Sequence, residues 1–145
     1  MTMLRKLMVG GAIAAVLGAS AYAGFAQPAP VEVDLTTGLA QGDQITARLD
    51  EDPDVFIGCG TRTIRTGGGT LVRTGFCQAR DAADEQVTCF TMDDDLLDAM
   101  QALSDFAFIT FSFVDDGAGG FECRRVGSST QSFYLFDYGS LKVKK

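Results

Sequence analysis

The sequence predicts an α+β fold: an antiparallel β-sheet meander with one packed α-helix and two disulfides. Three observations support this class. Strand-like segments are separated by glycine-rich or acidic turns, a single segment has the apolar spacing of a helix, and four cysteines occur in a chain that begins like an exported protein. The domain that these features predict spans residues 55–138.

Residues 1–26 have the features of a signal peptide. A basic start is followed by an apolar segment at residues 7–17, and small residues then provide cleavage sites that end at Ala23 or Ala26. The apolar run approaches the length that spans a bilayer, so an uncleaved anchor is the alternative. We expect removal of the leader and a periplasmic or extracellular protein with no stable membrane anchor.

The charge of the remaining chain limits its partners. Two of the 12 basic residues, Arg5 and Lys6, leave with the leader while all 19 acidic residues stay, so the formal net charge changes from −7 to −9. An excess of negative charge disfavours nucleic acid and anionic membrane surfaces as partners. We therefore expect a protein or glycan partner and no nucleic acid.

Residues 27–54 are predicted to form an extended lead-in with one short strand at residues 44–49. Prolines near both ends of this region favour extended chain and turns over regular ladders. The last residues, 139–145, are predicted to form a tail beyond the domain.

The centre of the predicted meander is a β-hairpin at residues 76–90, with its turn around Ala83. This register places Cys77 opposite Cys89, and it pairs Phe76 with Phe90 on the other face. An earlier strand at residues 55–66 joins the hairpin through a turn of three glycines, which supply the required backbone freedom.

The four cysteines are predicted to form two disulfides, because an even number in an exported chain is typical of structural bridges. Opposed residues of an antiparallel pair have Cα atoms about 4.5 to 5.5 Å apart, which suits a disulfide. We therefore predict Cys77–Cys89, and this choice leaves Cys59–Cys123. A Cys₄ zinc site is the alternative, although the paired C-x₂₋₄-C spacing is missing.

One amphipathic helix is predicted from Asp93 to Ser104, with Thr91 or Asp93 as its N-cap. Its apolar stripe consists of Leu96, Ala99, Met100 and Leu103, with Leu97 at the edge. Three strands are predicted to follow, at residues 106–114, 121–126 and 131–136.

Several of these segments resemble a known group of proteins. Four features are similar to a family of small exported proteobacterial proteins of uncharacterised function. They are the segment Phe76-Cys77-Gln78-Ala79-Arg80-Asp81, the second cysteine at Cys89, the Leu97-Asp98-Ala99 helix and the segment Ser129-Thr130-Gln131-Ser132-Phe133-Tyr134-Leu135. The resemblance covers about residues 58–135. It implies export and a single domain, and it assigns no active-site residue.

The composition excludes several chemistries. The sequence contains no histidine, which excludes Ser-His-Asp and Cys-His nucleophilic catalysis. Asp50, Asp52 and Asp54 have the spacing that begins a calcium loop, but Val55 and Thr61 occupy its glycine and bidentate-acid positions. We therefore predict no catalytic residue, no metal and no cofactor, and we interpret the acidic segments as solvated turns.

The candidate site residues are four arginines that recur along the meander. They are Arg62, Arg65, Arg73 and Arg80. If they gather, they would form an anion-binding site for an anionic glycan, a lipid headgroup or an acidic partner. We therefore predict a non-enzymatic binding or envelope-associated role. The alternatives are a small carboxylate-dependent hydrolase, which needs two acids flanking a cleft, and a structural envelope protein without a ligand.

Overall fold

The computed structural model describes residues 25–135. The predicted leader up to residue 24 and the predicted tail at 139–145 lie outside the described residues. Within them, seven strands form one sheet in the order β1-β2-β6-β7-β5-β4-β3. The strands are β1 Glu32–Asp34, β2 Leu39–Asp43, β3 Phe56–Arg65, β4 Leu71–Arg80, β5 Gln86–Thr91, β6 Phe108–Asp115 and β7 Phe121–Ser129.

The sheet is mixed, and this corrects the predicted antiparallel meander. Strands β3, β4 and β5 do follow one another as antiparallel neighbours, but β5 pairs in parallel with β7. A parallel pair needs a long crossover connection, which here consists of a helix and β6. The other predicted lead-in residues contribute as well, because β2 pairs with β6 inside the same sheet.

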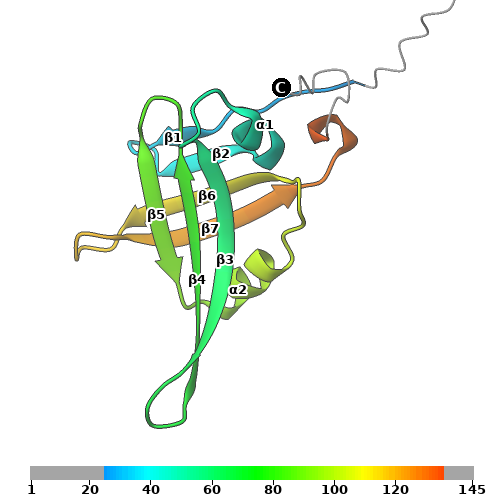
Figure 1. Cartoon of the computed structure of the whole chain (residues 1–145). Helices are drawn as coiled ribbons and strands as arrows, with labels where there is room; N and C mark the ends of the chain where they lie inside the picture. The colour runs from blue at the N-terminus through cyan, green and yellow to red at the C-terminus, as the bar shows by residue number, and fades with distance from the viewer. Residues whose placement is uncertain (1–24, 136–145) are drawn as a thin grey trace, which may run out of the picture.

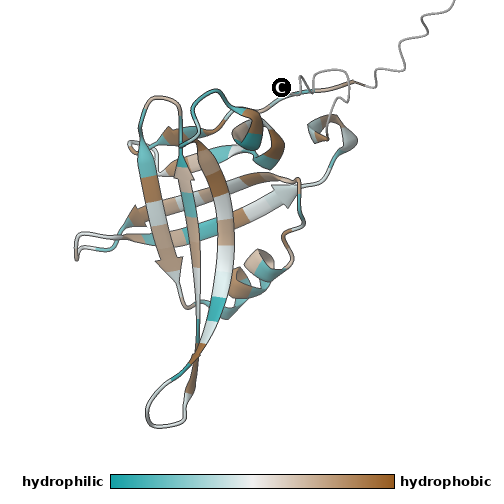
Figure 2. Ribbon diagram, in the orientation of Figure 1, coloured by the Kyte–Doolittle hydropathy of each residue, from teal (hydrophilic) through white to brown (hydrophobic). Residues whose placement is uncertain are grey.

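The sheet bends so that its two halves enclose one core. In Figure 1, β3, β4 and β5 run in front of β6 and β7, with β1 and β2 behind their upper ends. One cluster of buried residues includes Ile57 and Val87 from the first half and Ala40 and Phe111 from the second. Apolar and polar bands alternate along the strands in Figure 2, as expected for strands with one buried face.

A buried carboxylate joins the two ends of the sheet. Asp81 follows β4, and its Oδ2 accepts a hydrogen bond from the backbone N–H of Val33 in β1 at 3.2 Å. Its Oδ1 accepts from the N–H groups of Ala83 and Glu85 at 2.9 and 3.0 Å, which fixes the turn before β5. Strands β4 and β1 lie near opposite ends of the strand order, so the hydrogen bond from Val33 to Asp81 connects the two ends of the bent sheet. We call this connection the clasp.

The strand predicted at residues 44–49 is wrong, because Gln44–Leu49 forms the helix α1. Asp43 at the end of β2 is its N-cap, and Oδ1 accepts from the N–H of Thr46 at 2.7 Å. The other oxygen, Oδ2, accepts from the N–H of Ala29 at 2.7 Å, which ties the preceding extended chain to the helix start. Aspartate is a preferred N-cap residue, so Asp43 was the helix-start signal in the sequence.

The predicted amphipathic helix is confirmed as α2, Asp94–Gln101, with Asp93 as its N-cap. The prediction that Leu97 lies at the edge of its stripe is wrong, because Leu97 and Met100 are the buried residues. The helix rests directly on Gly75 of β4. A Cβ atom at Gly75 would lie 2.8 Å from Leu97 Cδ2 and closer still to Met100 Sδ, so the absent side chain allows this contact.

The end of the described chain also differs from its prediction. Instead of a strand at residues 131–136, Ser132–Tyr134 forms the short 3₁₀ helix η1. The ring of Tyr134 stacks on Phe108 with centroids 5.1 Å apart, and the carbonyl of Phe133 accepts from the N–H of Gln27 at 2.8 Å. Aromatic packing therefore holds this segment against β6, outside the strand order of the sheet.

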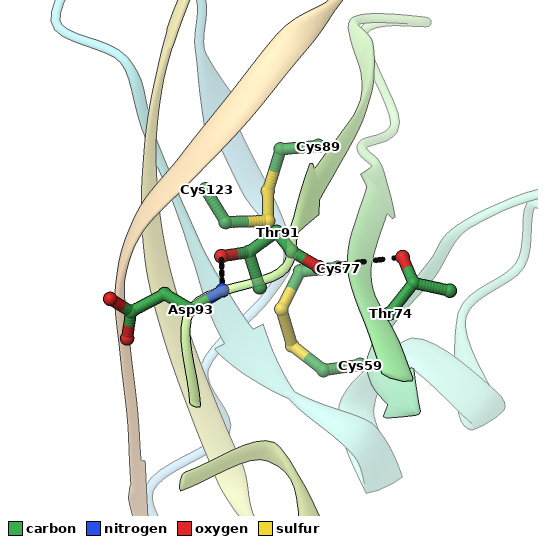
Figure 3. Close-up of a disulfide and its surroundings, with 7 residues drawn as sticks. All are labelled: Cys59, Thr74, Cys77, Cys89, Thr91, Asp93 and Cys123. Carbon is green, nitrogen blue, oxygen red and sulfur yellow. Dashed lines mark hydrogen bonds between the residues drawn. A yellow bond between two sulfur atoms is a disulfide. The ribbon is translucent and has the colours of Figure 1, made fainter. Parts of the chain in front are cut away.

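Both disulfides are present, but their pairing corrects the prediction. Cys59 is bonded to Cys77 and Cys89 to Cys123, as Figure 3 shows. The predicted hairpin register is confirmed, with Cys77 directly opposite Cys89, yet Cys77 is also directly opposite Cys59 on its other side. The cysteines thus form a row across β3, β4, β5 and β7.

The row explains why the predicted pairing fails. Neighbouring strands lie about 4.8 Å apart, so the two outer cysteines, Cys59 and Cys123, are separated by three strand spacings, or about 14 Å. A disulfide needs Cα atoms closer than about 7 Å. Bonding Cys77 to Cys89 would therefore leave the outer pair unable to join, whereas the observed pairs have Cα separations of 4.0 and 5.0 Å.

Candidate functional site

The β3–β4 hairpin extends beyond the sheet as a projecting arm, which we define as residues 61–74. Strands β3 and β4 each have ten residues, but β5 pairs with β4 only from Gly75 onward. The arm is therefore a two-stranded ribbon, and it projects downward in Figure 1. Its glycine turn was predicted, and Gly69 has the positive φ of +83° that favours glycine.

The arm has a composition unlike the rest of the chain. It contains three arginines and no acidic residue, whereas the whole chain has a formal net charge of −7. Two large apolar residues near its tip, Ile64 and Leu71, are 53% and 56% exposed. The arm is thus a basic and partly apolar surface on an acidic protein.

Arg73 is neutralised within the fold. Its guanidinium donates to the carboxylate of Asp98 at 2.9 Å and lies 3.5 Å from that of Asp94, both in α2. This ion pair links the base of the arm to the helix. Arg73 therefore contributes to the position of the arm rather than offering a free charge.

Arg62 and Arg65 keep uncompensated charges. The guanidinium of Arg62 lies 5.0 Å from the centre of the Phe76 ring, and Arg65 donates to the carbonyl of Gly69 at 2.9 Å. Among residues 25–135, no ion pair includes either arginine. Since neither contact supplies a negative charge, both arginines can take an anion.

Arg80 lies at the other end of β4, away from the arm. It forms ion pairs with Asp54 at 3.1 Å and with Asp84 at 2.5 Å. Hydrogen bonds from its guanidinium to Asp54 and Asp84 raise the pKa of Arg80 above its ordinary value. The structure thus places three of the four candidate arginines on the arm, with Arg65 and Arg73 on one face and Arg62 on the other. It leaves Arg80 in a separate surface network.

Several of the remaining acidic groups have backbone partners. Asp52 accepts from the N–H of Asp54, and Asp50 from that of Asp52, so the acidic turn is held by its own backbone. N–H donation by Ala118 and by Gly120 to Asp116 holds the pKa of that carboxyl below its ordinary value. In the part of the chain that the structure describes, no group of three or more potential ligands is arranged to hold a metal ion.

Two surface depressions accompany these features. One, of about 420 Å³, lies beside the base of the arm, and its lining includes the exposed side chains of Phe90 and Met92 together with Asp116 and Glu122. The second, of about 460 Å³, lies between α1 and η1.

The buried carboxylates of Asp43 and Asp81 are occupied by backbone N–H groups, so they give the alternative of a carboxylate hydrolase no support.

The overhang of the arm is the feature that sequence reasoning missed. The signal was a length mismatch, since the first hairpin can pair over ten residues while the second can pair over only six.

Within residues 25–135, none of the helices is both long and apolar enough to span a bilayer. Comparison with protein families, curated proteins and solved structures gives no match, so the family resemblance stays a prediction.

Proposed function

We propose that the protein is an exported binding domain that holds an anionic partner against the arm. Support for export comes from the leader-like residues 1–26 and from two disulfides, which are typical of oxidising compartments. The observation that carries the binding role is the pair of uncompensated arginines, Arg62 and Arg65, on a projecting ribbon without acidic residues.

The acidic body does not prevent binding of an anion by the arm. The five residues of β3 in the arm extend about 17 Å at 3.4 Å per residue. Arg65, near the tip, therefore lies farther from the body than the Debye length of about 8 Å at physiological ionic strength, whereas Arg62 lies at the base of the arm beside Phe76. The partner meets the positive field of the arm, while the body repels anions that approach elsewhere.

The proposal is tested with two polyanions, heparin and poly-glutamate, in a titration at moderate salt. The variant Arg62→Gln/Arg65→Gln should bind both at least tenfold more weakly than the unmodified protein. The matched control is Arg124→Gln/Arg125→Gln in β7, which removes the same charge from another exposed strand. It should change affinity less than twofold.

Equal weakening by the two double variants would contradict the proposal, since binding would then follow net charge and not the arm. Absence of binding to either polyanion at low salt would contradict it as well. Native folding of each variant is checked by the presence of both disulfides and an unchanged melting temperature.

A further inference from the structure

Strand β3 is an edge strand. It is last in the strand order, and within residues 25–135 it pairs with β4 alone. Helices α1 and α2 both contact β3, whereas residues 62–65 in the arm are all exposed. An unpaired edge presents backbone donors and acceptors to any extended chain that approaches.

The register identifies which residues present those groups. In an antiparallel ladder, narrow pairs alternate with hydrogen-bonded pairs, and the groups of narrow pairs point away from the partner strand. The Cα separation of 4.0 Å marks Cys59 and Cys77 as a narrow pair, and the hydrogen bond from Thr66 N–H to Thr70 C=O marks the other kind. Both observations place Thr61, Thr63 and Arg65 in narrow pairs with β4. Their N–H and C=O groups therefore point away from β4, toward the open edge of the sheet.

The side chains along this edge favour an acidic strand. Because side chains alternate between faces, Arg62 and Arg65 lie on opposite faces of β3. A strand added at the edge would meet one arginine on each face, and carboxylates across from them form favourable cross-strand pairs. Backbone hydrogen bonds would supply affinity, and the arginines would supply selectivity.

The same charges disfavour a second copy of this chain at the edge. Another arm would bring three more arginines and no carboxylate, and like charges on adjacent strands are destabilising. A two-stranded ribbon is by itself only marginally stable, so a third strand would also stabilise the arm. We infer that the partner is a protein with an extended acidic segment, which the arm binds as an added strand at residues 61–65 of β3. This inference rests on the proposed function and narrows it to a peptide partner.

The test uses a fluorescein-labelled peptide of eight residues in which pairs of glutamates alternate with pairs of threonines, so that an added strand presents carboxylates on both faces. Anisotropy reports its binding. Thr63→Pro removes one outward N–H and places a ring at the edge, a substitution that edge strands tolerate when the N–H faces solvent. We expect at least tenfold weaker binding. The matched control Thr63→Ala keeps the N–H and should stay within twofold of the unmodified protein.

Amide hydrogen exchange on the full chain provides the second measurement. Saturating peptide should slow exchange of Thr61, Thr63 and Arg65 at least tenfold. Unweakened binding by Thr63→Pro, or unchanged exchange at these three amides, would overturn strand addition. If heparin binding nevertheless depends on Arg62 and Arg65, the proposed function stands and this inference alone fails; if neither probe binds, both fail.

Discussion

Replacement of Asp81 by asparagine isolates the clasp between the two ends of the sheet. The carboxylate is buried and accepts three backbone hydrogen bonds. Asparagine has one carbonyl oxygen, which can keep the bonds from Ala83 and Glu85 in the turn. Its NH₂ group then faces the N–H of Val33, so two donors oppose each other.

The structure sets the size of the effect. An unsatisfied buried N–H costs about 1–3 kcal/mol, and the two remaining bonds weaken because their acceptor loses its charge. We expect Asp81→Asn to lower the free energy of unfolding by about 2–4 kcal/mol. At about 4 °C per kcal/mol for a domain of this size, the melting temperature should fall by roughly 8–16 °C.

Urea denaturation of the oxidised protein measures this loss, with Asp84→Asn as the matched control. Asp84 carries the same charge but is exposed, and its positive φ of 68° is one that asparagine accepts readily. Its loss should cost less than about 1 kcal/mol, as for other surface ion pairs. Equal costs for the two variants, or a Val33 amide that exchanges as slowly in Asp81→Asn as before, would refute the reasoning.

Three further outcomes test the packing, the disulfides and the acid response. Gly75→Ala should destabilise the fold by about 1–3 kcal/mol in urea, because the new Cβ overlaps buried side chains of α2; full stability would show that the helix does not rest on this residue. Peptide mapping without reduction should recover Cys89 linked to Cys123, and Cys89→Ala/Cys123→Ala should cost about 2–5 kcal/mol; a peptide with another partner for Cys89 would contradict the pairing. Because the pKa of Asp116 is lowered in the fold, its stabilising contribution is present above about pH 4 and is lost as pH falls through that lowered pKa. An NMR titration that gives Asp116 an ordinary pKa would contradict this.

The sequence predicts what short-range periodicity decides. The register of the second hairpin is confirmed residue by residue, because alternation and the turn together permit one pairing. Alternation likewise decides the core face of β6, where Ile109, Phe111 and Phe113 are buried. These features need no knowledge of distant strands.

What the sequence does not decide depends on contacts between distant segments. The disulfide pairing requires knowing that Cys77 has a cysteine on both sides, which depends on β3 as well as β5. The candidate site has the same limit. Arg62 and Arg73 look alike in the sequence, and the position of α2 decides that Arg73 is neutralised.

The row of cysteines also has a consequence for the order in which the chain emerges. Cys77 lies directly opposite both Cys59 and Cys89. If it bonds to Cys89, Cys123 is left without a cysteine close enough to form a disulfide. A chain that leaves a ribosome or a translocation channel from its N-terminus presents Cys59 and Cys77 together before Cys89 follows. The direction of emergence therefore favours the pairing that lets all four thiols oxidise, whereas a full-length reduced chain that refolds at once faces both choices.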